Sequence, residues 1–241
     1  MASIYIILGA AGSGRREILA DLIANGLDAS APVRVYHTGE FDDSTFPAPV
    51  ETQHWGISEG TLSVDTPETA PETVFFVADG RANPVDQMEI FAALIPRLGW
   101  KVARVLTVVH CSLLDQHPEL GDWFKACIHF SDAALLARRE GVSNAWLKRF
   151  TDAHKEACNP CALELVKKGT VENPARILLP EARRLSMVFD DTDPLDEMEF
   201  DEENLPDEPF DLKSKPDPYF ERIPNGARRI QIPDIARFIA P

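Results

Sequence analysis

Three glycines followed by two arginines form the candidate binding site nearest the N-terminus. The stretch from Gly9 to Arg16 places two glycines with four residues between them ahead of two functional positions, which is the spacing of a phosphate loop. Glycines let backbone N–H groups converge on a phosphate, and a following helix adds its positive N-terminal dipole. The pattern therefore predicts an anion site built from the loop residues Gly9, Gly12, Ser13, Gly14, Arg15 and Arg16.

The two arginines change the chemistry that such a loop usually performs. A lysine normally reaches the terminal phosphates from the position of Arg15, and a Ser or Thr hydroxyl binds magnesium from the position of Arg16. Arg15 can still pair with phosphate oxygens, although its guanidinium is bulkier than an ammonium. Arg16 has no acceptor oxygen, so we expect no magnesium site at this position. The alternative is a glycine turn between a strand and a helix that holds no ligand.

A strand, a helix and further strands are predicted around this loop. Apolar runs of strand length cover residues 3–8, 33–36, 73–78, 102–109 and 133–137, and helical spacing covers residues 15–25 and 84–98. Buried strands that alternate with helices indicate a doubly wound α/β fold with a mostly parallel sheet. In such sheets, ligands bind at the carboxyl ends of the strands.

Composition narrows the class of protein. The 241 residues include 24 Lys+Arg and 39 Asp+Glu, a formal net charge of −15 that argues against a generic nucleic-acid or anionic-membrane binder. No apolar run approaches the ~18–20 residues of a membrane span. The first twelve residues have no basic stretch ahead of their short apolar run, which favours a strand over a signal peptide. Four cysteines without a disulfide-rich pattern favour a cytoplasmic protein.

The negative charge is concentrated near the C-terminus. From Asp190 to Asp211 there are twelve acidic residues and no Lys or Arg, so the rest of the chain carries only −3 of the net −15. Prolines and few aliphatic residues disfavour packing there. We predict a phosphate-loop domain over residues 1–189, an acidic extended arm over 190–217, and a short C-terminal element over 218–241, with a strand at 228–232 and a helix at 233–239. The arm is either a solvated tail or a docking segment for a basic partner or pocket.

Cys158 and Cys161, with His154 upstream, have the spacing of a zinc or redox site. His110 or Cys111 would supply a fourth ligand. Asn159 and Pro160 explain the same stretch as the start of a helix, because Asn is a good N-cap and Pro a good first helical residue. A single pair of cysteines is a weak signal, so we expect neither zinc nor redox chemistry here.

Several segments together resemble the CobW-type P-loop GTPases, a metallochaperone-related family. The segment from Thr73 to Pro84 (TVFFVADGRANP) is similar to the family's strand and Gly-x-Ala-Asp-Pro stretch, and Glu40-Phe41 to its Asn-Glu-Phe-Gly stretch. VLTVVH at residues 105–110, FSDAALLARREG at 130–141 and NPCA at 159–162 resemble further family segments in the same order. The resemblance covers residues 3 to about 172 and implies the P-loop fold, with GTP as nucleotide.

The residues that do chemistry in that family differ here. When the family's motifs are aligned with this sequence, Arg15 stands at the position of the loop lysine and Arg16 at that of the magnesium-binding hydroxyl. Val77 stands at the position of the acid on the third strand. The resemblance makes Glu40 and Asp79 candidates for a magnesium or switch ligand. It makes Arg138 and Glu140 candidates for binding the base, in place of the family's Lys and Asp. The family's cysteine metal motif and its C-terminal domain are absent from this sequence.

Losing the lysine, the hydroxyl and the strand acid together removes most of the apparatus of phosphoryl transfer. The sequence thus favours a degenerate, non-hydrolysing relative that binds a nucleotide or phosphate anion, GTP among them, with no magnesium or zinc expected. One alternative is an active GTPase or metallochaperone that uses rewired phosphate and magnesium ligands. The other is a protein-interaction module whose acidic arm is the functional part.

Overall fold

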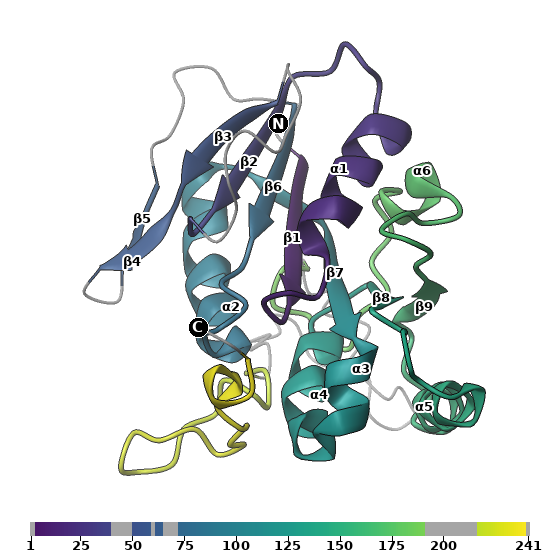
Figure 1. Cartoon of the computed structure of the whole chain (residues 1–241). Coiled ribbons are helices and arrows are strands. Elements are labelled where there is room, and N and C mark those ends of the chain that lie inside the picture. Colours follow the sequence, from purple (N-terminus) through teal and green to yellow (C-terminus); the bar gives the residue numbers. More distant parts are fainter. Residues whose placement is uncertain (1–2, 40–49, 59–60, 65–71, 191–215, 240–241) are drawn as a thin grey trace, which may run out of the picture.

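Seven parallel strands form the central sheet of the computed structural model, which describes residues 3–39, 50–58, 61–64, 72–190 and 216–239. The sheet order is β3-β2-β6-β1-β7-β8-β9, and each neighbouring pair runs parallel (Figure 1). The strands are β1 (Ser3–Gly9), β2 (Val33–His37), β3 (Glu51–His54), β6 (Thr73–Val77), β7 (Lys101–His110), β8 (Ala133–Ala137) and β9 (Ala162–Leu165). A separate antiparallel hairpin joins β4 (Gly56–Ser58) to β5 (Thr61–Ser63).

Both faces of the central part of this sheet are buried, which is why β1, β6 and β8 are continuous apolar runs. In β1, Ile4, Ile6 and Leu8 enter one core and Tyr5 and Ile7 enter the other. The helices α1 (Arg15–Gly26) and α6 (Pro174–Ile177) cover the second core. The opposite face is covered by α2 (Pro84–Leu94), α3 (Cys111–Gln116), α4 (Gly121–His129) and the peripheral helix α5 (Asn144–Glu156).

The predicted doubly wound α/β fold class is confirmed, and so is each predicted strand and helix of the first 140 residues. The helical stretch 84–98 divides into α2 and a 3₁₀ turn, η2 (Ile95–Leu98), because Pro96 cannot donate the backbone hydrogen bond that would continue the α-helix. The hairpin β4–β5, the short edge strands β3 and β9, and the helices α3, α4, α5 and α6 have no counterpart in the predictions.

The helix predicted to begin at Asn159 is wrong. α5 ends just before this point, Cys158 takes the left-handed conformation with φ 49°, and the Asn159 side chain accepts a hydrogen bond from the Cys161 N–H (3.0 Å). The turn at Asn159 is followed by β9 instead of a helix. The N–H of the first residue of β9, Ala162, donates to the Asp132 carbonyl (3.0 Å). An Asn that caps a helix and an Asn that closes a turn use the same side-chain oxygen, so the local signal fits both.

A buried ion pair fastens the chain after α6 to the sheet. The Arg184 Nη1 lies 3.1 and 2.9 Å from the two carboxylate oxygens of Asp132, and both side chains are almost fully buried. Asp132 also accepts from the backbone N–H groups of Val105 (2.7 Å) and Arg183 (2.6 Å). The carboxylate is thereby paired and fully hydrogen-bonded, as a buried charge must be.

The C-terminal element packs against the main body. Among the described residues, the strand predicted at 228–232 is reduced to one bridge between Arg222 and Arg228, and the helix predicted at 233–239 to a 3₁₀ turn, η4 (Ile235–Arg237). Ile235 is buried in the core beneath α2, and the Arg228 Nη2 lies 2.7 Å from Asp86 Oδ1. Residues 191–215 lie outside the described ranges, so the predicted boundaries of the acidic arm remain predictions.

Candidate functional site

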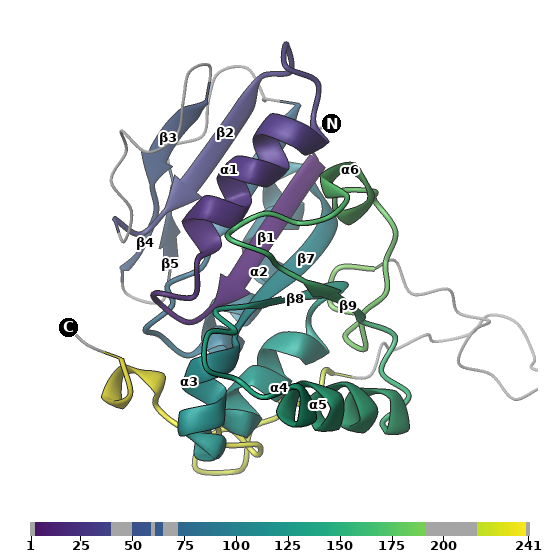
Figure 2. The same cartoon turned by 45° about the vertical axis from the view of Figure 1, so that its right-hand side comes forward.

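The phosphate loop, residues 9–16, joins the carboxyl end of β1 to the start of α1. Figure 2 shows it at the edge of the sheet where the neighbouring parallel strands β7 and β8 also end. Gly9 has φ 134°, and a Cβ atom there would lie 2.5 Å from the Val108 carbonyl oxygen of β7. Only glycine allows this conformation and this close approach, which explains the first glycine of the motif in physical terms.

The N-terminus of α1 has no side-chain cap. Gly14 is its N-cap residue, with φ 94°, and the first backbone bond of the helix runs from the Ile18 N–H to the Gly14 carbonyl (3.1 Å). The N–H groups before Ile18 therefore have no acceptor within the helix. Beside them, the Ser13 Oγ is fully buried and has no hydrogen-bond partner among the described residues. Donors without an acceptor in the helix and a buried, unpartnered hydroxyl at a helix N-terminus are groups to which an anion can bind.

Two other amides of the loop already have protein acceptors. The Ala11 N–H donates to the Gly80 carbonyl and the Ser13 N–H donates to the Ala10 carbonyl, both at 3.1 Å. The first bond holds the loop against the chain that follows β6, and the second closes a turn within the loop. A phosphate would therefore be bound by the helix N-terminus and the neighbouring side chains rather than by every amide of the loop.

Arg15 points beneath the loop rather than out of it. Its side chain is buried and its Nη1 lies 2.5 Å from the Ala78 carbonyl, at the end of β6. Gly80 lies so close that a Cβ atom there would meet the Arg15 guanidinium and the carbonyl carbon of Ala10, the latter at 2.8 Å. Arg15 thus ties the phosphate loop to the end of β6. Arg16 is half-buried at the first turn of α1.

Arg138 is the cation that lies at the mouth of the loop. It follows β8 with a left-handed φ of 48°, and its Nε donates to the Gly12 carbonyl (3.1 Å). Its Nη2 lies 3.1 Å from the Glu17 carboxylate on α1. Both partners of this ion pair are more than two-fifths exposed, so solvent reaches them. The guanidinium is accessible to a ligand, unlike that of Arg15.

An open cleft of about 1060 Å³ lies beside the loop and α1. The described residues that line it include Ser13, Gly14, Glu17, Arg138, Arg139, Glu140 and the turn from Val166 to Thr170. Four cations (Arg138, Arg139, Lys167 and Lys168) face two carboxylates (Glu17 and Glu140), a positive balance in a chain whose net charge is −15. We name this the loop cleft. It brings the sequence-predicted residues Ser13, Gly14, Arg138 and Glu140 to one place.

Of the two predicted magnesium or switch candidates, Asp79 does not line this cleft. β6 ends at Val77, so Asp79 lies beyond the strand, and its Oδ1 accepts from the Arg81 N–H (2.8 Å) in a local turn. Gln87 of α2 fixes the Asp79 backbone by accepting from its N–H (2.7 Å) and donating to its carbonyl (3.0 Å). Glu40, the second candidate, lies outside the described residues.

His110 at the end of β7 has a structural use. Its Nδ1 accepts from the Leu113 N–H (3.2 Å) and so caps α3. Burial lowers the pKa of His110, and the nearby Arg138 lowers it further. A neutral imidazole is the form that can accept this hydrogen bond, so the capping role and the lowered pKa agree.

The residues His154, Cys158 and Cys161 do not converge. The His154 Nε2 lies 2.7 Å from the Cys161 carbonyl, and Cys158 is exposed while Cys161 is buried. Burial, with a smaller contribution from Asp132, raises the pKa of the Cys161 thiol to about 12, which disfavours the thiolate that binds zinc. Across the described ranges, no three His, Cys, Asp or Glu side chains are placed to hold a metal ion.

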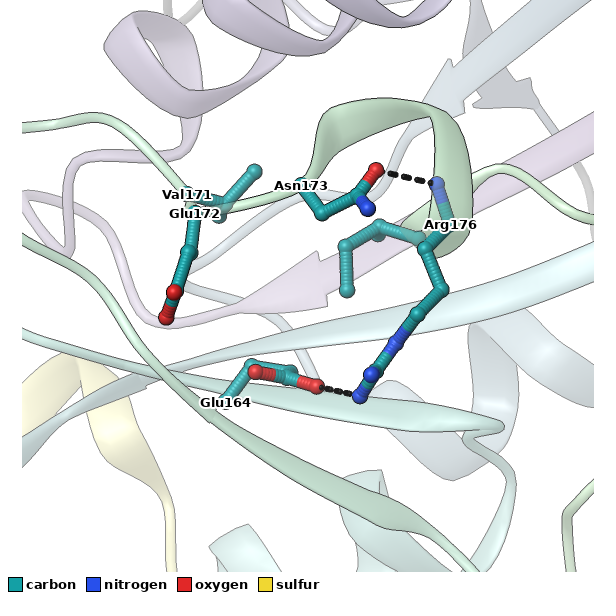
Figure 3. Close-up of a pocket in the computed structure, with 6 residues that line it drawn as sticks. Glu164, Val171, Glu172, Asn173 and Arg176 are labelled. Carbon is teal, nitrogen blue, oxygen red and sulfur yellow. Dashed lines mark hydrogen bonds and ion pairs between the residues drawn. The ribbon is translucent and has the colours of Figure 1, made fainter.

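A smaller cavity of about 360 Å³ lies between β9 and α6. Figure 3 shows Arg176 reaching down from α6 to Glu164 of β9, with the two joined at 2.5 Å. The Asn173 side chain is turned back to accept from the Arg176 N–H (3.1 Å), as the N-cap of α6. The cation of this cavity is therefore paired internally, in contrast to the surplus of cations in the loop cleft.

The sequence predictions missed Glu17 and the turn after β9. Glu17 lies in the helix predicted at 15–25 but was not a site candidate, and Lys167 and Lys168 fall in a region where no strand was predicted. A strand at 162–165 would have placed both lysines at the carboxyl edge of the sheet beside the phosphate loop, since parallel strands end at one edge. The signal was present, but a four-residue strand that contains Glu164 is hard to distinguish from a loop.

Comparisons with known proteins give two solved structures that resemble this chain. One is a Zn(II)-bound triple mutant of the YjiA GTPase, with 11% sequence identity and a TM-score of 0.46 over 76% of this chain and 67% of that chain. The other is the Zn(II)-bound YjiA GTPase from E. coli, with 10% identity and a TM-score of 0.43 over 76% of this chain and 66% of that one. No protein-family model and no curated protein matches. None of the helices in the described ranges is long and apolar enough to cross a membrane.

Proposed function

We propose that this chain binds a nucleotide or another phosphate anion at the phosphate loop and in the loop cleft, without competent hydrolysis of GTP. The observation that carries the proposal is the uncapped N-terminus of α1, with the buried, unpartnered Ser13 Oγ beside it and a cation-rich cleft of about 1060 Å³ alongside. Helix N–H donors and arginine side chains are the groups that bind phosphate in proteins.

The position of Arg15 supports the loss of hydrolysis. Phosphoryl transfer needs a cation on the terminal phosphates and a magnesium ion held by a hydroxyl and a carboxylate. The Arg15 guanidinium donates to the Ala78 carbonyl, and the Arg16 side chain has no oxygen that could bind magnesium. The Asp79 carboxylate accepts from the Arg81 N–H in a local turn. We therefore expect binding without hydrolysis, because the described part of the site offers groups that bind phosphate but no carboxylate or hydroxyl placed to hold magnesium for turnover.

The test is calorimetric titration of the full chain with GTP, ATP and pyrophosphate, each with and without magnesium, followed by an assay of phosphate release. We expect binding that does not require magnesium and no release of phosphate under saturating GTP and magnesium. Failure of all three ligands to bind a folded sample would overturn the proposal. Magnesium-dependent release that Arg15→Ala abolishes would replace it with an active GTPase whose ligands are rewired.

A further inference from the structure

A second hollow, which shares no lining residue with the loop cleft, is lined mainly by apolar and aromatic side chains. Helices α4 and α5 lie on the same side of the molecule (Figure 2) and enclose a groove of about 680 Å³. Phe124 and Ile128 of α4 form one wall, and Trp146 and Phe150 of α5 form the other. We name this the α4–α5 groove.

The α5 wall is incompletely covered by the rest of the protein. No residue of this helix is buried, and Trp146 and Phe150 stack with ring centroids 5.4 Å apart while remaining partly exposed. An amphipathic helix normally buries its apolar stripe against a neighbour. A groove with partly exposed aromatic side chains on its α5 wall therefore indicates an occupant.

The chain itself passes the end of this groove twice. Leu185 and Tyr219 both line it, and they flank the 25-residue segment 191–215 at a distance of a few residues. Both flanks are held at His129 of the groove, since the Ser186 N–H donates to the His129 carbonyl (3.1 Å) and Asp217 Oδ2 lies 2.8 Å from the His129 Nε2. The segment thus leaves and returns at the same end of the groove.

The chemistry of that segment complements the groove. It carries eleven acidic residues against two lysines, a net charge of −9, and six apolar side chains spread among them: Leu195, Met198, Phe200, Leu205, Phe210 and Leu212. Lys125 and Arg149 stand exposed on the groove rim, and Arg149 has no ion-pair partner among the described residues. Asp115 is the single carboxylate on the lining.

We propose that segment 191–215 of the same chain docks in the α4–α5 groove, with its apolar side chains between the aromatic walls and its carboxylates against Lys125 and Arg149. Fully extended, 25 residues span ~85 Å, which is ample for a path along the groove and back. Tethering at both ends also raises the effective concentration of the segment to the millimolar range, so a weak intrinsic affinity is enough. A second copy or a separate protein lacks this advantage.

The first experiment measures binding of a synthetic peptide of residues 191–215 to two forms of the full-length chain. In one form these residues are replaced by Gly and Ser over the same length; the other form is unchanged. We expect the peptide to bind the replaced form and to bind the unchanged chain at least tenfold more weakly, because the groove is already occupied. Phe200→Ser with Phe210→Ser in the peptide, at equal charge, should weaken binding at least tenfold, and so should Arg149→Glu in the replaced chain.

Three outcomes would overturn the proposal. They are the absence of binding to either chain, equal binding to both chains, and a molar mass of the unchanged chain that rises with concentration, which would assign the groove to a second copy. A separate measurement distinguishes loss of docking from misfolding of a variant. Hydrogen exchange of α4 and α5 in the full chain should rise when Phe200 and Phe210 are replaced by Ser, and should stay unchanged with Thr192→Ser in the same segment.

Discussion

Arg138 and Gly12 are 126 positions apart in the sequence, yet the Arg138 Nε lies 3.1 Å from the Gly12 carbonyl oxygen. The contact places an accessible guanidinium at the mouth of the phosphate loop, while the arginine within the loop, Arg15, is buried beneath it. The spacing of the loop predicted a phosphate contact for Arg15, and the family resemblance implied a base contact for Arg138. The geometry instead favours Arg138, paired with Glu17, as the side chain that a ligand of the loop meets first.

Replacing the two partners of this ion pair should change anion affinity in opposite directions. Arg138→Ala removes a charged donor and should weaken binding of pyrophosphate or GTP about tenfold, the equivalent of about 1.4 kcal/mol. Glu17→Gln removes a carboxylate that repels the anion and competes for Arg138, and should tighten binding about three- to fivefold. Calorimetry measures both changes, with Arg149→Ala on α5 as the matched loss of a positive charge outside the cleft. Weaker binding in both variants would contradict this assignment.

Arg15 should matter for stability rather than for affinity. Arg15→Met keeps the length of the side chain but leaves the Ala78 carbonyl without the guanidinium donor, at a cost of about 1–3 kcal/mol in the free energy of unfolding. Ligand affinity should change by no more than about twofold in a folded sample. Chemical denaturation and calorimetry on the same preparation separate the two effects. Loss of binding with unchanged stability would show that Arg15 is a phosphate ligand after all.

Elements with two buried faces were the predictable part of this fold. β1 and β6 are apolar at every central position because both faces of the sheet are covered, and the run length alone identifies them as strands. β9 escaped prediction because it is a four-residue edge strand with no fully buried residue. Because β9 was not predicted, Lys167 and Lys168 were not recognised as site residues. Their position in the loop cleft depends on where β9 ends.

Directions of side chains were the unpredictable part of the site. Whether an arginine after a glycine loop points outward or inward depends on what lies beneath the loop, here the Ala78 carbonyl and the adjacent Gly80. These contacts join positions more than sixty residues apart, and spacing within the motif carries no information about them. The same holds for Asn159. Its side chain closes a turn rather than capping a helix, because the residues that follow it pair with β8 as the strand β9.

Arg183 and Arg184 are adjacent arginines whose replacement should change stability by very different amounts. Arg184→Ala leaves the Asp132 carboxylate buried without its cation and should lower the free energy of unfolding by about 3–5 kcal/mol. Arg183→Ala should change it by less than about 0.5 kcal/mol, because its side chain is exposed and only its backbone N–H reaches Asp132. Denaturant unfolding of the two variants makes the comparison. Equal losses would show that the segment after α6 is held by something other than this ion pair.

The link between His129 and Asp217 should make stability depend on pH in the acid range. Burial alone would raise the pKa of Asp217, but hydrogen bonds from His129 and Ser186 outweigh it and hold the pKa below its ordinary value of 3.8. Because the folded state binds this proton less tightly than the unfolded state, the contribution is complete above that value and is lost as the pH falls through the lower, folded pKa. Asp217→Asn should lower stability at pH 7 by about 1–3 kcal/mol and flatten the decline of stability below pH 4. Denaturant unfolding between pH 7 and pH 3 tests this, with the exposed Asp115→Asn as control, and a decline that is equally steep in both variants would contradict the assignment.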